Sequence, residues 1–330
     1  MDRPIQTVIR GTGSFVPARV VPNADFADTL DTSDEWIRSR TGIRERRYAE
    51  PGDTAATMGT AAARHALTAA GLTAADLDLI VCATVTPDLM CPSTACLIQA
   101  SLGCRTVPAF DVVAACSGFV YALAVAEQFL RSGTAAHALV VGAEVLSRVC
   151  DFTDRNTCIL FGDGAGAVVL SGSPDARRGI HQLRLFADGS RQELIQVPSL
   201  VTPNPPPGSG TLPNLRYLRM NGREVFRFAV AQLRALIEQA IDDCRSFDKE
   251  LRCIVPHQVN VRIIDAALEG LDFPAEKVMV NLDKYGNTSA ASVPIAFDEA
   301  VRTGMCKAGD TVLLVAFGGG LTWSSALLTL

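Results

Sequence analysis

The sequence has little of what metal-binding, membrane-spanning or nucleic-acid-binding proteins require. Only four histidines occur in 330 residues, and no two of the ten cysteines form a Cys-x-x-Cys pair, so a metal centre has few ligands to use. The longest apolar runs, such as residues 119–126, are too short to cross a bilayer. The 30 basic and 35 acidic residues are interleaved, without the basic block that suggests nucleic acid. We therefore expect no metal, no membrane segment and no nucleic-acid partner.

The signature of secretion is also missing. The segment that begins Met1-Asp2-Arg3-Pro4 does not show the charged and then apolar pattern of a signal peptide. The cysteines are scattered and most stand among apolar residues, where a thiol acts as a small hydrophobic group. These features predict a cytoplasmic protein rather than a secreted disulfide framework.

What is present indicates a globular α/β protein larger than one average domain. Hydrophobic residues make up 48% of the chain and charged ones 20%. Apolar runs alternate with helical stretches, and their continuous hydrophobicity is typical of strands buried on both faces. The expected strands are 79–83, 108–113, 138–142, 165–170, 251–255, 278–281 and 311–316. The expected helices include 54–70, 117–131, 223–243 and 289–302.

The two halves of the chain resemble each other at an offset of 171 residues. At this offset residues 81–82 fall on 252–253, Cys116 falls on Asn287, and 131–133 fall on 302–304. Each half then closes with a glycine-rich turn and a terminal strand, which begin at Phe161 and Phe317. Two copies of one α/β unit explain this pattern, and we expect them at residues 1–175 and 176–330. A proline-rich stretch at 203–210 interrupts the second copy and predicts an exposed loop.

Cys116 is the first candidate for chemistry. It follows an expected strand and two alanines, and it opens the helix expected at 117–131. Unpaired backbone N–H groups at such a junction stabilise negative charge, so we expect a lowered thiol pKa and a nucleophilic thiolate. Its small neighbours leave room for a substrate carbonyl. The alternative is an inert buried cysteine.

His257 and Asn287 stand at comparable junctions. His257 follows the strand expected at 251–255 and a proline, at the strand edge where ligands bind in open α/β sheets. Asn287 lies among small residues before another expected helix, which it could simply cap. Each residue alone has a structural explanation. Together they place a thiol, an imidazole and a carboxamide at equivalent strand ends of a doubled fold, where they can converge.

At this point the chain resembles the β-ketoacyl-acyl carrier protein synthase III family of the thiolase-like superfamily, from about residue 5 to 330. The motifs that carry the resemblance are 32–37 (TSDEWI), 40–46 (RTGIRER), 115–119 (ACSGF), 161–167 (FGDGAGA), 256–260 (PHQVN), 286–289 (GNTS) and 317–323 (FGGGLTW). The resemblance implies a layered αβαβα fold made of two duplicated halves, each with a mixed sheet. It also implies a homodimer, which we expect to continue a sheet across a twofold axis.

The resemblance implies a two-stage condensation without a metal or organic cofactor. An acyl-CoA thioester acylates Cys116, with the backbone N–H groups of Cys116 and Gly319 as the oxyanion hole. Malonyl-acyl carrier protein then loses CO₂, and His257 and Asn287 donate hydrogen bonds to the enolate. The product is a β-ketoacyl carrier protein that initiates fatty acid synthesis, and Phe317 is a candidate gate of the malonyl pocket.

Further residues are assigned to binding by the same resemblance. Those that match CoA contacts are Trp36, Arg40, Arg155, Gly222 and Arg262. Arg227 and Arg262 match contacts with the carrier protein, although Glu269 and Gly270 stand where relatives often have lysines. The acyl pocket is assigned to Leu89, Met90 and Cys91, a region that often acts from the partner subunit. The starter acyl group is left open.

Several alternatives differ in what they require. A thiolase needs a second reactive cysteine in the C-terminal glycine turn, which residues 317–322 lack, and elongating synthases use two histidines. Chalcone-synthase-like enzymes share the Cys-His-Asn set but are longer and lack the pattern of Trp36 and Arg40. A non-catalytic scaffold relative lacks the cysteine. The strongest alternative is a specialised relative that primes a polyketide or makes an ester or a quinolone-type product.

Overall fold

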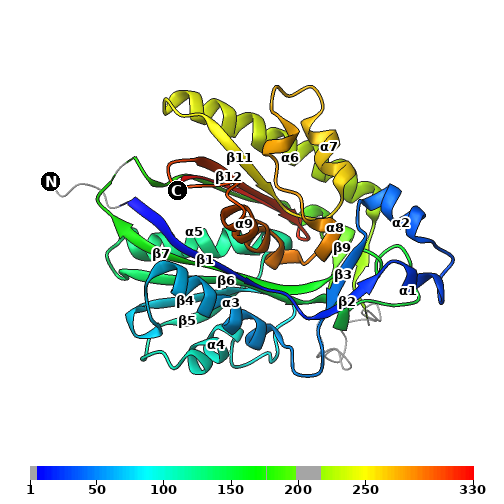
Figure 1. The fold of residues 1–330 in the computed structure, drawn as a ribbon, viewed down its shortest axis with the longest axis horizontal. Helices are drawn as coiled ribbons and strands as arrows, with labels where there is room; N and C mark the ends of the chain where they lie inside the picture. Colours follow the sequence, from blue (N-terminus) through cyan, green and yellow to red (C-terminus); the bar gives the residue numbers. More distant parts are fainter. Residues whose placement is uncertain (1–5, 176, 198–216) are drawn as a thin grey trace.

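The computed structural model describes residues 6–175, 177–197 and 217–330, so the loop predicted at 203–210 lies outside the described residues. Two β-sheets form the centre of the molecule (Figure 1). The first contains, in spatial order, β1 (Gln6–Phe15), β7 (Asp163–Ser173), β6 (His137–Val145), β4 (Leu79–Ala83) and β5 (Ala109–Val112). The second contains β11 (Leu251–Pro256), β12 (Thr311–Gly318), β13 (Thr322–Thr329) and β8 (Gly179–Ala187).

Both sheets contain parallel and antiparallel strand pairs. In the first, β4 runs parallel to β5 and β6, while β7 is antiparallel to β6 and β1. In the second, β11 runs parallel to β12, and β13 is antiparallel to both β12 and β8. Two small antiparallel pairs lie outside the sheets: β2 (Arg19–Pro22) with β3 (Glu45–Tyr48), and β9 (Ile195–Gln196) with β10 (Arg219–Met220).

Helices fill the space between the sheets and cover their outer faces. The middle layer is α5 (Gly118–Arg131) and α9 (Ser292–Arg302), which pack on strands of both sheets. The outer layers are α3 (Ala55–Ala70) with α4 (Thr94–Leu102), and α6 (Gly222–Ser246) with α7 (Val261–Leu268). The predicted αβαβα layering is confirmed. The remaining helices are α1 (Ala24–Ala27), α2 (Asp34–Thr41), α8 (Leu282–Tyr285) and the 3₁₀ turns η1 (Ala74–Asp76), η2 (Ala115–Ser117), η3 (Leu146–Arg148), η4 (Gly189–Leu194), η5 (Ala275–Lys277) and η6 (Ser289–Ala291).

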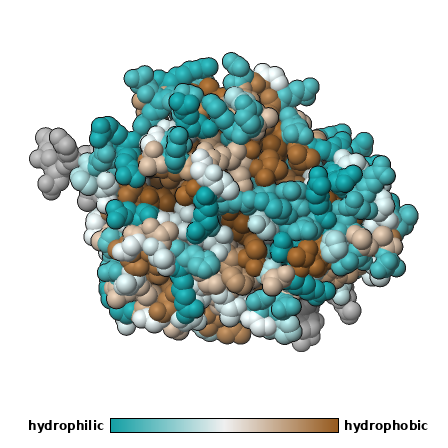
Figure 2. Space-filling view, viewed as in Figure 1, coloured by the Kyte–Doolittle hydropathy of each residue, from teal (hydrophilic) through white to brown (hydrophobic). Residues whose placement is uncertain are grey.

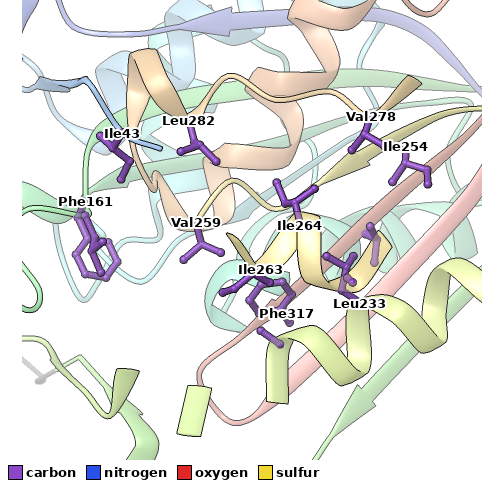
Figure 3. Packing of buried hydrophobic residues seen from close by; sticks show 14 of the residues in the cluster. Ile43, Phe161, Leu233, Ile254, Val259, Ile263, Ile264, Val278, Leu282 and Phe317 are labelled. Carbon is purple, nitrogen blue, oxygen red and sulfur yellow. The ribbon is translucent and has the colours of Figure 1, made fainter. Parts of the chain in front are cut away.

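The central strands are apolar on both faces because each face meets a helical layer. Along β12, Val312 and Leu314 pack into the cluster between the sheets, whereas Leu313 and Phe317 pack into the cluster under α6 and α7. Successive strand side chains point to opposite faces, so a strand between two layers needs an unbroken apolar run. Figure 3 shows part of the second cluster, where Phe317 packs with residues of α6 and α7.

The strand predicted at 278–281 is wrong. Only one bridge forms there, between Val278 and Ile254, together with a hydrogen bond from the Met279 N–H to the Ile254 carbonyl. The Oε1 atom of Gln258 then accepts from the N–H groups of Asn281 and Leu282, at 2.9 and 3.2 Å. A side chain thus takes the place of a neighbouring strand, and the backbone turns into α8.

The predicted repeat needs two offsets instead of one. The ends of α5 and α9 match at an offset of 171, where Gly133 and Gly304 both have positive φ. Their beginnings match at 174, because Ala115 and Ser289 share a left-handed backbone, with φ of 47° and 49°. The cause is helix length, since α5 has 14 residues and α9 has 11. The division at residues 175/176 stays a prediction; it falls between β7 and β8, where the strands of one sheet give way to those of the other.

Candidate active site

Cys116 lies in η2, the short turn that joins β5 to α5 at the inner layer. The turn is tight because Ala115 adopts a left-handed φ of 47°. Gly318, at the end of β12, packs directly on this turn: a Cβ atom there would lie 2.6 Å from the Cys116 nitrogen. The second sheet therefore reaches the nucleophile of the first half only because residue 318 is glycine. Cys116 remains partly accessible at the wall of a cavity.

His257 follows β11 and is held by hydrogen bonds at both its backbone and its ring. Its N–H donates to the Val315 carbonyl at 2.8 Å, and its Nδ1 lies 2.6 Å from the Ser292 hydroxyl. The Gln258 N–H also donates to that hydroxyl at 3.4 Å, and among the described residues Nδ1 is the one acceptor within reach of the buried Ser292 O–H, so we assign the hydroxyl proton to the bond with Nδ1. The ring proton then sits on Nε2. Burial lowers the pKa of His257 to about 3, which makes it a neutral donor at physiological pH.

Asn287 is oriented in a similar way: a hydrogen bond holds the oxygen of its side-chain amide and leaves the nitrogen free to donate. Its backbone is held by Leu160 and Gly162, through bonds of 2.8 and 2.9 Å. Its Oδ1 accepts from the Ser289 N–H at 2.8 Å. The carbonyl end of the amide is therefore occupied within the turn, and the NH₂ end is the one that can donate.

These three residues line one cavity of about 570 Å³, including open solvent. Phe317 stands edge-on to the His257 ring, with 5.3 Å between ring centroids, and is almost fully buried. The remaining walls are mostly apolar: Val85, Ala115, Leu146, Phe161, Ile195, Val197, Leu218, Met220, Val225, Phe228, Val259, Ser289, Gly318, Gly319 and Leu321. The arrangement offers a thiol and two neutral hydrogen-bond donors in a mainly apolar space. Such a site suits a reaction in which negative charge develops on an oxygen.

The expectation of a lowered thiol pKa is wrong in this structure. Burial raises the pKa of Cys116 to about 12, opposed by a hydrogen bond from Ser289 and reinforced by the charge of Glu144. The α-helix itself begins only at Gly118, after a 3₁₀ turn. The effect of removing water from the sulfur therefore outweighs the pKa-lowering effect of the helix terminus. Formation of the thiolate then needs a group that accepts the thiol proton.

A second cavity, of about 1120 Å³ including open solvent, adjoins the first. Trp36, Arg40 and Gly222 line it, as the resemblance implies, and it shares Met220 and other wall residues with the first cavity. The guanidinium carbons of Arg40 and Arg155 lie 5.0 and 5.1 Å from the centroid of the Trp36 ring. The side of the molecule that carries α1 and α2 is largely hydrophilic (Figure 2).

Of the predicted basic contacts only Arg40 lines a cavity; Arg155, Arg227 and Arg262 lie outside the lining of both. Arg227, on α6, forms an exposed ion pair with Glu224 at 2.9 Å. Arg262 is exposed and lies in the first turn of α7, a helix that begins after its N-cap, Asn260. Residues 269–270 follow the last residue of α7, Leu268, and form its terminating turn.

Leu89, Met90 and Cys91 do not line the cavity of Cys116 in their own chain. Leu89 is 50% exposed and Met90 71%, and Cys91 is exposed as well. They follow β4 on the surface of the first half. Their assignment to an acyl pocket therefore requires a second subunit and stays a prediction.

Comparison with known proteins agrees with this geometry. Two family models match, 3-oxoacyl-[acyl-carrier-protein (ACP)] synthase III over residues 110–189 and its C-terminal counterpart over residues 245–330. The chain is 51% identical over 328 residues to a β-ketoacyl-[acyl-carrier-protein] synthase III of Xylella fastidiosa, with 99% of both chains covered. It belongs to the β-ketoacyl-[acyl-carrier-protein] synthase III family.

Solved structures of family members have the same fold. The 3-oxoacyl-[acyl-carrier-protein] synthase III of Aquifex aeolicus matches with a TM-score of 0.88 and 48% identity, covering 98% of this chain and all of that one. The priming β-ketosynthase of a polyketide pathway also matches with a TM-score of 0.88, at 37% identity, covering 100% of this chain and 98% of that one. The predicted family and thiolase-like fold are confirmed, and with them the class of acyltransferases.

Two expected absences can be compared with the part of the chain that the structure describes. There, no cluster of three or more His, Cys, Asp or Glu side chains is arranged to hold a metal ion. No described helix is both long and apolar enough to span a membrane. The cytoplasmic location stays a prediction.

Sequence reasoning missed two groups in this family member. Glu144, near the end of β6, is fully buried and is linked through Ser289 to Cys116. Its signal was a single acidic residue in the otherwise apolar run 138–146. Ser292 was also overlooked, because in sequence it is one small residue among several.

Proposed function

We propose that this chain catalyses the decarboxylative condensation of an acyl-CoA with malonyl-acyl carrier protein, and so initiates fatty acid synthesis. The observation that supports it is the convergence of Cys116, His257 and Asn287 on one mainly apolar cavity. CoA is a leaving group here, and the reaction uses no metal or organic cofactor.

In the first step the Cys116 sulfur attacks the thioester carbon of the acyl-CoA. The carbonyl oxygen becomes an oxyanion, which the N–H groups of Cys116 and Gly319 stabilise. Gly319 suits this role because it lies in the turn after β12 and lines the cavity. A Cβ atom at this position would meet Ile195 at 3.3 Å, so a side chain would crowd the turn. The acyl group stays on the sulfur and CoA departs.

In the second step malonyl-acyl carrier protein loses CO₂ and leaves an enolate. The Nε2–H of His257 and the NH₂ of Asn287 donate to the enolate oxygen, and its carbon attacks the acyl-Cys116 thioester. The hydrogen bonds of His257 Nδ1 with Ser292 and of Asn287 Oδ1 with the Ser289 N–H support this assignment. They leave the Nε2–H and the NH₂ group free to donate to the substrate. Phe317 packs against the His257 ring and is the candidate gate.

Substrates reach the sulfur through the second cavity. Trp36, Arg40, Arg155 and Gly222 hold the nucleotide part of CoA, with an indole for stacking and guanidinium groups for phosphates. Arg262 lies farther out, where it can contact either CoA or the carrier protein, and Arg227 contacts the carrier protein. Both are exposed, which a contact with a protein partner needs.

The enzyme works as a homodimer in which the acyl pocket receives residues from the partner. β5 is an edge strand of the first sheet, and Val113, just beyond it, is 76% exposed. Leu89, Met90 and Cys91 are exposed on the same half. Pairing of two β5 strands would continue the sheet across a twofold axis and cover these apolar side chains.

The structural match to a polyketide-priming β-ketosynthase keeps a second candidate open, a specialised condensing enzyme of secondary metabolism. The two candidates differ in starter and acceptor. A panel of acyl-CoA thioesters, each followed by mass spectrometry of Cys116, identifies the starter. Labelled malonyl-acyl carrier protein and malonyl-CoA, offered separately to the acylated enzyme, identify the acceptor.

The fatty-acid function predicts acylation of Cys116 and label in a β-ketoacyl carrier protein. Cys116→Ser serves as the matched control and should accept far less acyl group. Label that appears only with malonyl-CoA would favour the specialised enzyme. Absence of acylation with every thioester would overturn both candidates and favour a scaffold.

A further inference from the structure

Glu144 is a carboxyl group buried without a cation. It is 0% exposed, and no ion pair involving it occurs among the residues that the structure describes. It receives hydrogen bonds from the Thr84 and Thr86 hydroxyls, the Val85 N–H, the Ser289 hydroxyl and the Ala290 N–H. A group satisfied only by neutral donors in a dry site can hold either a charge or a proton.

Most of these donors are locked in place. The Thr86 hydroxyl accepts from the Val145 N–H at 2.8 Å, so its proton points to Glu144, 2.6 Å away. The Thr84 hydroxyl accepts from the Thr86 N–H at 3.1 Å and donates in the same direction. These hydroxyls hold the carboxyl but do not connect it to the cavity.

Ser289 is different because its hydroxyl has two titratable neighbours, the carboxyl of Glu144 and the thiol of Cys116. Its Oγ donates to Glu144 Oε1 at 3.0 Å, and Ser289 lines the same cavity as Cys116, where its hydroxyl favours the thiolate and so acts to lower the pKa of the thiol. Ser289 is placed there by its left-handed backbone, with φ of 49°, and by its N–H bond to Asn287 Oδ1. Carboxyl and hydroxyl are thus hydrogen-bonded, and the thiol is the next polar group along the cavity wall.

Charge balance decides where the proton of this chain resides. Among the described residues, the charge of Glu144 raises the pKa of two thiols, Cys116 and, on β4, Cys82. Burial raises the pKa of all three groups, and that of Glu144 reaches about 7. Thiolate and carboxylate together would put two negative charges in one dry site, which is unfavourable. Moving one proton from sulfur to carboxylate keeps the net charge unchanged.

We propose that Glu144 accepts the Cys116 proton through Ser289. The thiol proton moves to Ser289 Oγ while the Ser289 hydroxyl proton moves to Glu144 Oε1, which leaves a thiolate beside a neutral carboxylic acid. The thiolate attacks the acyl-CoA carbonyl, the bond from that carbon to the CoA sulfur breaks, and the proton returns by the same path to the departing sulfur. Thiol and thioester thereby become a new thioester and CoA thiol.

His257 does not serve as this base. Its Nδ1 is engaged with Ser292 and its Nε2 already carries a proton, so it has no lone pair to offer the thiol. Burial also opposes formation of the imidazolium. The proposal rests on the proposed function for its substrate, but formation of the thiolate can be tested without one.

The experiment measures alkylation of Cys116 by iodoacetamide between pH 5 and 9, followed in the Cys116 peptide by mass spectrometry. That readout separates Cys116 from the exposed Cys91. The variants are Glu144→Gln and Ser289→Ala, with Ser324→Ala as control because it removes a buried hydroxyl that has no hydrogen-bond partner in the described structure. Wild-type alkylation should fall as Glu144 gains its proton, below pH values near its pKa of about 7.

Both test variants should alkylate roughly 100-fold more slowly at pH 8, because a proton acceptor typically contributes a factor of 10²–10⁴. Their rates should also rise steadily from pH 5 to 9 instead of levelling off above pH 7, because the unassisted thiol has a pKa of about 12. The control should match the wild type. Simple electrostatics predicts the opposite for Glu144→Gln, since removal of a nearby negative charge favours the thiolate. Faster alkylation, or an unchanged pH profile, would overturn the proposal.

Ser289→Ala decides the question if Glu144→Gln does not fold. It leaves the bonds from Thr84, Val85 and Thr86 intact, and Ala115 shows that alanine adopts the same backbone in the first half. If the wild type and both variants alkylate as expected but no acyl-CoA acylates the wild type, the proposed function is contradicted and the relay is supported. Normal acylation with unaltered profiles in the variants would contradict the relay alone.

Discussion

At the scale of the residue, the site is governed by which end of each polar side chain is already occupied. His257 and Asn287 both use one end to bind a serine, Ser292 and Ser289, and so turn a donor toward the substrate. A buried imidazole is otherwise free to choose either tautomer, and only one of them donates from Nε2. The hydroxyl of Ser292 makes that choice, although it touches no substrate.

Replacement of Ser292 by alanine should therefore affect one half of the reaction. We expect condensation with malonyl-acyl carrier protein to slow by roughly tenfold or more, since loss of a full oxyanion donor costs 10²–10³. Acylation of Cys116 should be nearly unchanged. Single-turnover assays of the two steps would show the difference. Equal slowing of both steps would indicate a general structural defect instead.

The buried neutral state of His257 also has a consequence for stability. Its native pKa, about 3, lies below the ordinary value of 6.5, so below pH 6.5 the unfolded chain binds a proton that the native site refuses. This contribution to stability is complete above pH 6.5 and falls as the pH decreases toward 3. His257→Gln removes it.

The free energy of unfolding of the wild type should thus fall relative to His257→Gln by up to about 1.4 kcal/mol for each pH unit below 6.5. Urea unfolding at pH 7 and pH 5 measures this difference. His65→Gln, which replaces an exposed histidine, is the control. A constant difference between pH 7 and pH 5 would show that His257 titrates normally.

At the scale of the element, the site depends on close approach between backbones of the two halves. Gly318 ends β12 against the η2 turn, and Gly142 lies in β6 against η6, where a Cβ atom would meet the Ala290 carbonyl oxygen at 2.3 Å. Strands and turns can touch at these points only without a side chain. Each contact fixes the turn that carries a functional residue, Cys116 in one case and Ser289 in the other.

Gly318→Ala should disturb this contact, because its Cβ would lie 2.6 Å from the Cys116 nitrogen. We expect a loss of about 1–3 kcal/mol in stability, typical of overpacking, and a marked loss of Cys116 acylation. Gly52→Ala is a suitable control, since a Cβ atom at residue 52 would have no other atom within 4 Å. Thermal unfolding and acylation rates would test both. Retained stability and acylation in Gly318→Ala would contradict the tight contact.

At the scale of the whole molecule, the acyl pocket raises the question of the partner subunit. Met90 is 71% exposed and lies outside its own cavity, so it can shape a pocket only across an interface. Met90→Trp should then shift the preference toward shorter acyl-CoA chains by roughly tenfold or more, the typical effect of one methylene group in an apolar pocket. Competition between acyl-CoA lengths measures it. Val20→Trp, another exposed apolar position, should leave the preference unchanged.

Much of the architecture followed from local pattern. The strands β4, β6, β7, β11 and β12 overlap their predicted runs, since burial on both faces demands continuous apolar sequence. The edge strands β1 and β8 were not predicted, because they mix polar residues and glycine with apolar ones. The strand expected at 278–281 failed because a distant side chain, that of Gln258, took the place of its partner.

The sequence by itself determined the fold family, the layered arrangement and the identity of the thiol, imidazole and carboxamide, because these depend on periodicity and on motifs read along the chain. Only the tertiary structure decided the protonation of the site. Burial, which no local pattern reveals, raised the pKa of Cys116 instead of lowering it, and brought Glu144 within reach through Ser289. The pKa of a group depends on what surrounds it in space, and residues 116, 144 and 289 become neighbours only when the two halves pack together.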